Sequence, residues 1–137
     1  SSAGKAWIHS GGQTTDQYTL WEHCAEQDTF LEAMADAAST VTKHFAGKIA
    51  YVAVMKNLSV DCDCCAVAED PCMNDVGILS SLDPVALDRA CIDLVRNSND
   101  PGRDHFMERV NSRHGTHTID AAEALGIGTQ DYELMRV

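Results

Sequence analysis

Basic residues are scarce in this sequence, and no segment is apolar enough to cross a membrane. Ten Lys and Arg residues stand against 21 Asp and Glu residues, so the formal net charge is −11. Such a surface repels phosphate groups, which excludes nucleic acid and anionic membranes as expected partners. No apolar run approaches the roughly 20 residues that a transmembrane helix needs, and the first residues show no secretory signal pattern.

Proline, aromatic residues and repeats are also sparse. Three of 137 residues are proline, 6% are aromatic, and there is no internal repeat, low-complexity tract or linker. With 45% hydrophobic residues, the composition is that of a globular protein, and the length suits one domain with its own core. Ser1 to Lys5 read as the interior of a longer sequence. We therefore expect a single domain over 1–137 that is a fragment or the C-terminal part of a longer protein.

Strand-like and helix-like segments alternate, which predicts an α/β domain. We expect a sandwich in which a small mixed or mostly parallel sheet is flanked by helices. The expected strands are 5–9, 49–58, 76–79 and an edge strand at 132–137. The expected helices are 29–45, 83–95, 104–110 and 118–125, with a partly helical stretch near 20–21. Thr29 and Glu32 form a capping-box pattern, and Asp83 before Pro84 is typical of a helix start.

The run Cys62-Asp63-Cys64-Cys65 places three thiols within four residues. In an extended chain Cys62 and Cys64 share one face, and Cys65 joins them only if the backbone turns. Thiolates favour zinc or iron–sulfur centres over magnesium or calcium. The spacing is neither the paired C-x2-C of a zinc ribbon nor a ferredoxin run, so it predicts a metal site without identifying the metal.

The six cysteines also permit roles that need no metal. Adjacent Cys64 and Cys65 could form a disulfide only in a strained ring, so a reducing cytoplasm fits better than a disulfide framework. The cluster could instead be a redox thiol pair or a set of small buried thiols. Cys72 is either a fourth ligand or an apolar substitute. Cys91 suits core packing, and Cys24 suits packing or an exposed position.

Two histidines are candidates to complete the site. His114 and His117 flank Gly115 in a turn, and a neutral His117 imidazole could join three thiolates. His9 ends an expected strand, where sites form in α/β proteins. Acidic residues surround the cysteines and could orient ligands, although they disfavour thiolates unless a cation is bound. These acids are Asp61, Asp63, Glu69, Asp70 and Asp75.

Several segments, taken in order, resemble a known family. They are Ala3-Gly4-Lys5 with His9-Ser10, Asp61-Cys62-Asp63-Cys64-Cys65, Asp75-Val76-Gly77-Ile78-Leu79, Asp83-Pro84-Val85-Ala86-Leu87-Asp88 and Gly115-Thr116-His117. The sequence thereby resembles the uncharacterised iron–sulfur-centre protein family, a domain of unknown function in bacteria and archaea. Fuller members of that family have a longer N-terminal region and a ferredoxin-type insert with cysteines for two [4Fe–4S] clusters.

The sequence departs from this family at the insert. No C-x2-C-x2-C run follows His9, and residues 11–21 stand where the insert would be, so those two clusters cannot be carried over. The resemblance implies Cys62, Cys64, Cys65, His9 and His117 as site residues. It implies no reaction.

The sequence thus predicts a cytoplasmic domain that binds an iron–sulfur cluster or a transition metal ion, either zinc or iron. It could be a redox or electron-transfer module whose partner is a redox protein or a small molecule. One alternative is an enzyme whose metal keeps an open coordination position and acts as a Lewis acid. The other is a non-catalytic interaction domain whose thiols are incidental.

Overall fold

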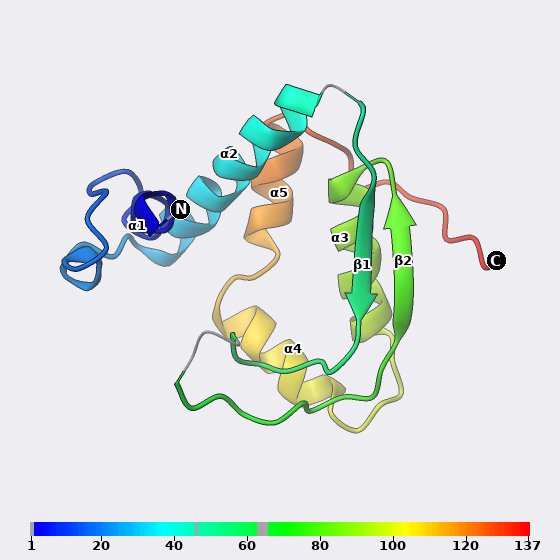
Figure 1. Ribbon diagram of the computed structural model, residues 1–137. Helices are drawn as coiled ribbons and strands as arrows, with labels where there is room; N and C mark the ends of the chain where they lie inside the picture. Colours follow the sequence, from blue (N-terminus) through cyan, green and yellow to red (C-terminus); the bar gives the residue numbers. More distant parts are fainter. Residues whose placement is uncertain (1, 46, 63–65) are drawn as a thin grey trace.

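The computed structural model describes residues 2–45, 47–62 and 66–137, and in it the helices lie behind and to one side of one small sheet (Figure 1). The elements are α1 Ser2–His9, a 3-10 helix η1 Leu20–Glu22, α2 Gln27–Phe45, β1 Tyr51–Met55, β2 Gly77–Ser81, α3 Pro84–Arg96, α4 Arg103–Ser112 and α5 His117–Ala124. The prediction of a small α/β domain is confirmed. None of the helices in these described ranges combines the length and apolar character needed to span a bilayer.

β1 and β2 pair with each other in antiparallel orientation, and α3 covers one face of the pair. Ala53 lies opposite Leu79 in the register, and Leu79 packs with Met55 and Val95. The strand direction differs from the mixed or mostly parallel sheet that the sequence predicts. A parallel pair needs a crossover, usually a helix, whereas the described part of the segment joining β1 to β2 contains no helix and returns at the same end of the sheet.

The first helix replaces a predicted strand. The strand expected at 5–9 is wrong, because α1 spans Ser2–His9. Ala6 and Ser10 are both fully buried, four residues apart on one helical face, and the Ser10 amide donates to the Ala6 carbonyl over 3.0 Å. Gly11 and Gly12, with φ of 58° and 86°, end the helix, and the Gly12 amide donates to the carbonyl of Trp7. A five-residue stretch is too short for periodicity to separate strand from helix.

Helix α2 begins at Gln27, two residues before the predicted cap. The Phe30 amide donates to the Glu26 carbonyl, so Thr29 already lies inside the first turn and the predicted capping box does not form. The end of the helix is as predicted, since Gly47 follows it with a φ of 79°. The predicted start of α3 is also confirmed: Asp83 Oδ1 accepts from the amides of Val85 and Ala86 over 2.9 and 3.0 Å.

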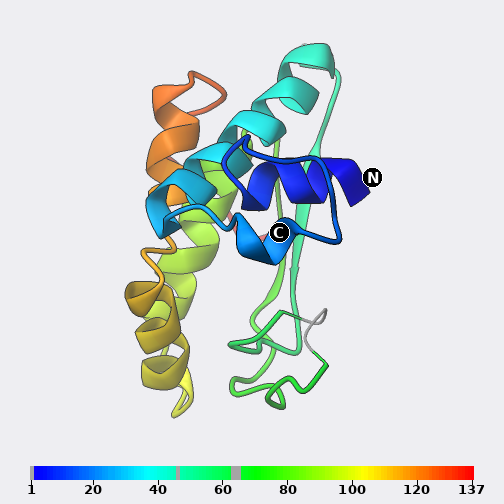
Figure 2. The same ribbon diagram turned by 90° about the vertical axis from the view of Figure 1, so that its left-hand side faces the viewer.

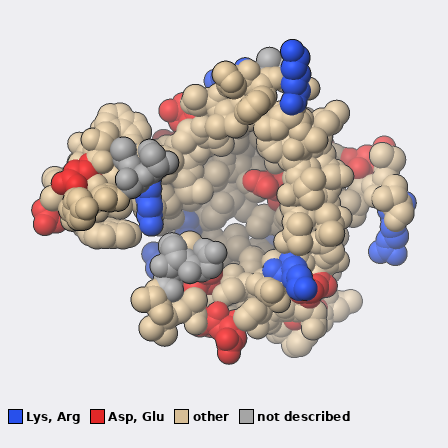
Figure 3. All heavy atoms as spheres, in the orientation of Figure 1, with Lys and Arg blue, Asp and Glu red and all other residues tan. Residues whose placement is uncertain are grey.

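The core is split into two clusters, which include buried residues from the start and from the end of α3. One joins α2, α3 and α5 around Ala35, Val85 and Ile119. The other joins the sheet, α3 and α4 around Met55 and Val95. The molecule is visibly hollowed between α2 and the sheet (Figure 3). Viewed from the side, α4 and α5 lie along one edge of the molecule, and the β1–β2 connection hangs below the sheet (Figure 2).

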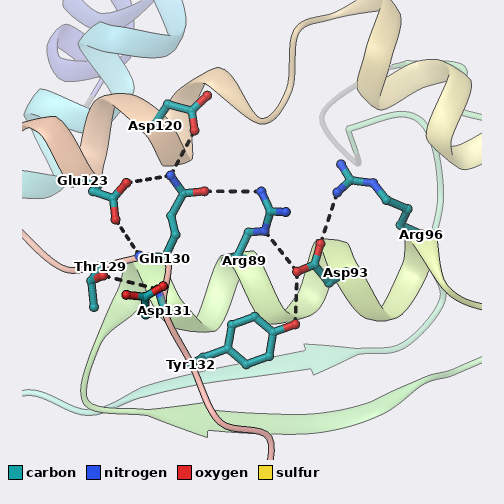
Figure 4. Close-up of polar contacts among 9 residues, drawn as sticks. All are labelled: Arg89, Asp93, Arg96, Asp120, Glu123, Thr129, Gln130, Asp131 and Tyr132. Atoms are coloured by element: carbon teal, nitrogen blue, oxygen red, sulfur yellow. Dashed lines mark hydrogen bonds and ion pairs between the residues drawn. The ribbon is translucent and has the colours of Figure 1, made fainter.

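The C-terminal segment does not form the predicted edge strand. Residues 127–137 contain no strand or helix, and side chains rather than a strand ladder attach this segment to α3 and α5 (Figure 4). Gln130 contacts both Glu123 and Arg89. The Tyr132 hydroxyl donates to Asp93 Oδ2 over 3.1 Å, and burial, together with this contact, raises the pKa of Tyr132.

Candidate metal centre

The cysteine run lies in a loop whose two arms are tied together. We call residues 58–72 the cysteine loop. At its neck the Cys72 amide donates to the Leu58 carbonyl over 2.8 Å. Further out, Ser59 Oγ donates to the Glu69 carbonyl and the Glu69 amide donates to Asp61 Oδ2, each over 3.0 Å. These contacts hold the described parts of the two arms side by side.

Helix α4 holds both arms of the cysteine loop through side chains one turn apart. Arg109 Nη1 donates to the Val60 carbonyl over 3.1 Å and to Asp61 Oδ1 over 2.7 Å. On the other arm, His105 Nε2 lies 2.8 Å from Glu69 Oε2. Because residues four apart share a helical face, α4 acts as a platform for the loop.

Asp61 is committed to this platform rather than available to a metal. Its carboxylate accepts from the Glu69 amide and from Arg109, and these two hydrogen bonds lower its pKa, the backbone bond most. Asp75, another predicted ligand-orienting acid, accepts from the Asn57 amide over 3.0 Å and shapes the end of β1. Asn57 has a φ of 53°, so this contact supports a left-handed turn.

Of the three predicted cysteine ligands, the structure describes Cys62, which is solvent-exposed directly after Asp61. Asp63, Cys64 and Cys65 lie outside the described residues, so the convergence of the three thiols stays a prediction. Within ranges 2–45, 47–62 and 66–137, no group of three or more His, Cys, Asp or Glu side chains could hold a metal ion. The predicted ligand set includes Cys64 and Cys65 and therefore lies partly outside these ranges.

The two predicted histidines are not brought together. The His9 ring stacks on Phe30 with centroids 4.7 Å apart, while His117 Nε2 lies 3.0 Å from Glu32 Oε1. Positions two apart on a helix project about 200° apart, so the histidines contact opposite sides of α2. Burial, with a smaller contribution from Lys5, lowers the pKa of His9.

His117 is one of two histidines that pair with α2. Its contact with Glu32 is the main cause of a raised pKa, and the charges of Asp28 and Asp120 act in the same direction. His114 Nδ1 lies 2.8 Å from Asp28 Oδ1. The turn between α4 and α5 is thus fastened to two successive turns of α2. The sequence does not predict these two contacts, although Asp28 and Glu32 are four residues apart and therefore lie on one face of α2.

The remaining cysteines divide as the sequence suggests, with Cys72 now assigned to packing. Cys72 is half-buried against the Met55, Met73 and Val95 cluster, and its Sγ donates to the Leu58 carbonyl over 3.5 Å. Cys91 packs in the same cluster, where burial raises its pKa. Cys24 is exposed near η1, with its Sγ 3.7 Å from the Leu20 carbonyl.

Comparison with known proteins identifies a family. The family described as "Domain of unknown function (DUF362)" matches residues 1–93. This part contains His9 and the cysteine loop, whereas residues 94–137, which include His117, lie outside it. No curated protein and no solved structure matches the chain. Since the match covers more than half of the sequence, the chain belongs to the DUF362 family of domains of unknown function.

Proposed function

We propose that this domain binds an iron–sulfur cluster or a transition metal ion, zinc or iron, through Cys62, Cys64 and Cys65. The observation that carries the proposal is the closed neck of the cysteine loop, which is tied across its arms and fixed to α4. A loop held in this way loses less conformational freedom when its tip closes around an ion. Three thiolates form a donor set suited to zinc and iron.

The proposed ligand set leaves out both histidines. His9 and His117 contact opposite sides of α2, and the Nε2 atom of His117 is already paired with Glu32. Three thiolates leave one position of a tetrahedral ion for water, a small molecule or a group from a partner.

Charge near the cysteine loop supports a bound cation. Glu69 and Asp70 join Asp61 and Asp63 close to the cysteines, and negative charge opposes the loss of a thiol proton. Arg109 offsets part of that charge, but it is committed to Val60 and Asp61. A metal ion supplies the positive charge that thiolates need here.

The same proposal gives the domain a place in electron transfer. An exposed cysteine at the loop tip lets a redox partner, protein or small molecule, approach the centre closely. The thiols need a reducing compartment such as the cytoplasm to remain available. As the family resemblance implies, the domain would be the C-terminal part of a longer protein without a ferredoxin insert.

Anaerobic purification followed by metal analysis tests the proposal. We expect bound iron with sulfide, or about one equivalent of zinc per chain. Cys62→Ser and Cys64→Ser should each lose it. Cys24→Ser is the matched control, because Cys24 is also exposed but lies near η1, and it should retain the metal. Protein that stays metal-free after reconstitution with zinc, or with iron and sulfide, contradicts the proposal.

A further inference from the structure

The sheet presents an apolar face that nothing in the described part of the chain covers. The register places Val52, Val54 and Ile78 on the face opposite α3. Their exposed fractions are 63%, 61% and 71%. Isolated exposed apolar residues are ordinary, but adjacent ones on a pleated face form a contiguous patch that commonly marks an interaction site.

The patch continues into the hollow beside β1. Val41 and Phe45 of α2 are also about half exposed, and a cavity of about 450 Å³ separates α2 from β1 and α3. Tyr51, Val52 and Ala53 line this cavity, whereas no residue of β2 does. The hollow therefore lies along the edge of β1 that β2 leaves open, and Figure 3 shows it opening on the same side as the sheet face.

The open edge of β1 is a site for strand addition. Among the described residues β1 pairs with β2 alone. A two-stranded sheet is only marginally stable without further packing, and an uncovered edge offers its backbone N–H and C=O groups to another strand. An added strand would lie about 4.8 Å from β1, on the side of the hollow.

A basic side chain stands at each end of this edge. Lys48 precedes β1 and Lys56 follows it, and neither forms an ion pair with any residue that the structure describes. In Figure 3 the sheet face is almost free of charge, with basic side chains at its upper end and with basic and acidic side chains together at its lower end. The five residues of β1 span about 16 Å between them. Lys48 and Lys56 therefore offer a positive charge at each end of the edge in a chain of net charge −11.

We propose that the β1 edge and the outer sheet face dock an extended segment of another polypeptide, which adds to the sheet as a third strand. Alternate apolar side chains of the segment cover Val52 and Val54, and acidic residues near its two ends pair with Lys48 and Lys56. This is recognition by β-augmentation, in which backbone hydrogen bonds provide affinity and side chains provide specificity.

One acidic group on the wall of the hollow fits this arrangement. Asp88 lines the cavity, and surrounding protein raises its pKa. Its carboxylate can accept a backbone N–H or a hydroxyl of the docked segment. A second copy of this chain is a poorer occupant, because two molecules of net charge −11 repel each other.

Three matched peptides test the proposal. All share one alternating valine–threonine centre, and their ends carry two glutamates, two glutamines or two lysines. Titration into the ¹⁵N-labelled chain, followed by amide chemical shifts and fluorescence anisotropy, should show the acidic peptide binding tightest. We expect the basic peptide to bind at least fivefold more weakly, with shifts confined to 48–56, 77–81 and the facing surface of α2.

Two variants distinguish the proposed docking from non-specific peptide binding. Lys48→Glu with Lys56→Glu should reverse the order of the peptides, a result that partial unfolding cannot produce. Val54→Lys, at an exposed position, should weaken binding of all three at least tenfold with an unchanged thermal melt. No binding below millimolar, binding that ignores peptide charge, or binding that survives Val54→Lys would each overturn the proposal. Self-association of the wild-type chain that Val54→Lys abolishes would also overturn it, because the occupant would then be a second copy.

Discussion

Asp83 ties two distant parts of the chain together, and its replacement should reveal how much stability each contact supplies. Asp83 Oδ1 caps α3 through the amides of Val85 and Ala86. Its other oxygen accepts from the Thr129 amide over 2.9 Å, which fastens the C-terminal segment to the start of α3. Asp83→Ala removes all three hydrogen bonds, while Asp83→Asn keeps an oxygen for the cap and cannot accept with its amide nitrogen.

The expected magnitudes follow from these contacts. Loss of an N-cap costs about 1 kcal/mol, with a range of about 0.5–2 kcal/mol, and the exposed bond to Thr129 contributes roughly another 0.5–1 kcal/mol. Asp83→Ala should therefore lower the free energy of unfolding by about 1–3 kcal/mol, and Asp83→Asn by about 0.5–1 kcal/mol. For a chain of this length the melting temperature should fall by roughly 3–12 °C for the alanine variant.

Urea denaturation monitored by far-ultraviolet circular dichroism measures both values. The C-terminal segment provides an independent readout, since the fluorescence of Tyr132 should change in both variants. Equal stability losses in Asp83→Ala and Asp83→Asn would refute separate contributions from the helix cap and from the hydrogen bond to Thr129. A loss below about 0.5 kcal/mol in the alanine variant would refute the cap itself.

Two further predictions concern the contacts that fasten α4 and α5. The raised pKa of His117 means that the protonated imidazole stabilises the fold fully below the unfolded pKa, and that this contribution disappears as pH rises through the folded pKa. The stability gap between the wild type and His117→Gln should thus shrink from pH 5.5 to 9 in urea titrations; a constant gap would exclude the ion pair with Glu32. Gly102, at the start of α4, lies against the Cys72 carbonyl so closely that a Cβ atom would overlap it, so Gly102→Ala should displace one arm of the cysteine loop and weaken metal binding at least tenfold. Gly47→Ala, where a Cβ meets nothing but the left-handed φ of 79° strains the alanine, controls for destabilisation far from the cysteine loop. Equal metal affinity in the two variants would argue against the role of α4 in holding the loop.

Elements with long periodic patterns or strong caps were predictable from the sequence. The apolar spacing in α2 and the Asp83-Pro84 start of α3 reflect local physics that acts within a few residues. The failures occur where local signals are short or where distant contacts decide. The α1 segment is too brief for periodicity, and the direction of β2 depends on how the intervening loop returns.

In the candidate site too, local features are predictable from the sequence and distant contacts are not. The cysteine loop can be placed after a strand from the sequence, because β1 is strongly apolar and the cysteines follow it. The contacts between α4 and the cysteine loop cannot be predicted in this way. Arg109 and Asp61 are 48 positions apart, and ion pairs at that separation leave no local sequence pattern. His117 is predictable as a turn histidine, but its partner Glu32 lies 85 positions away on α2.

X-ray absorption fine structure at the metal edge tests the central claim most directly. The zinc-loaded wild-type chain should show about three sulfur scatterers near 2.3 Å, the usual zinc–thiolate distance. Cys62→Ser should lower the sulfur count by about one, or abolish loading, and Cys24→Ser should leave the spectrum unchanged. A first shell made only of nitrogen and oxygen would contradict the account, because no thiolate of the cysteine loop would then be a ligand.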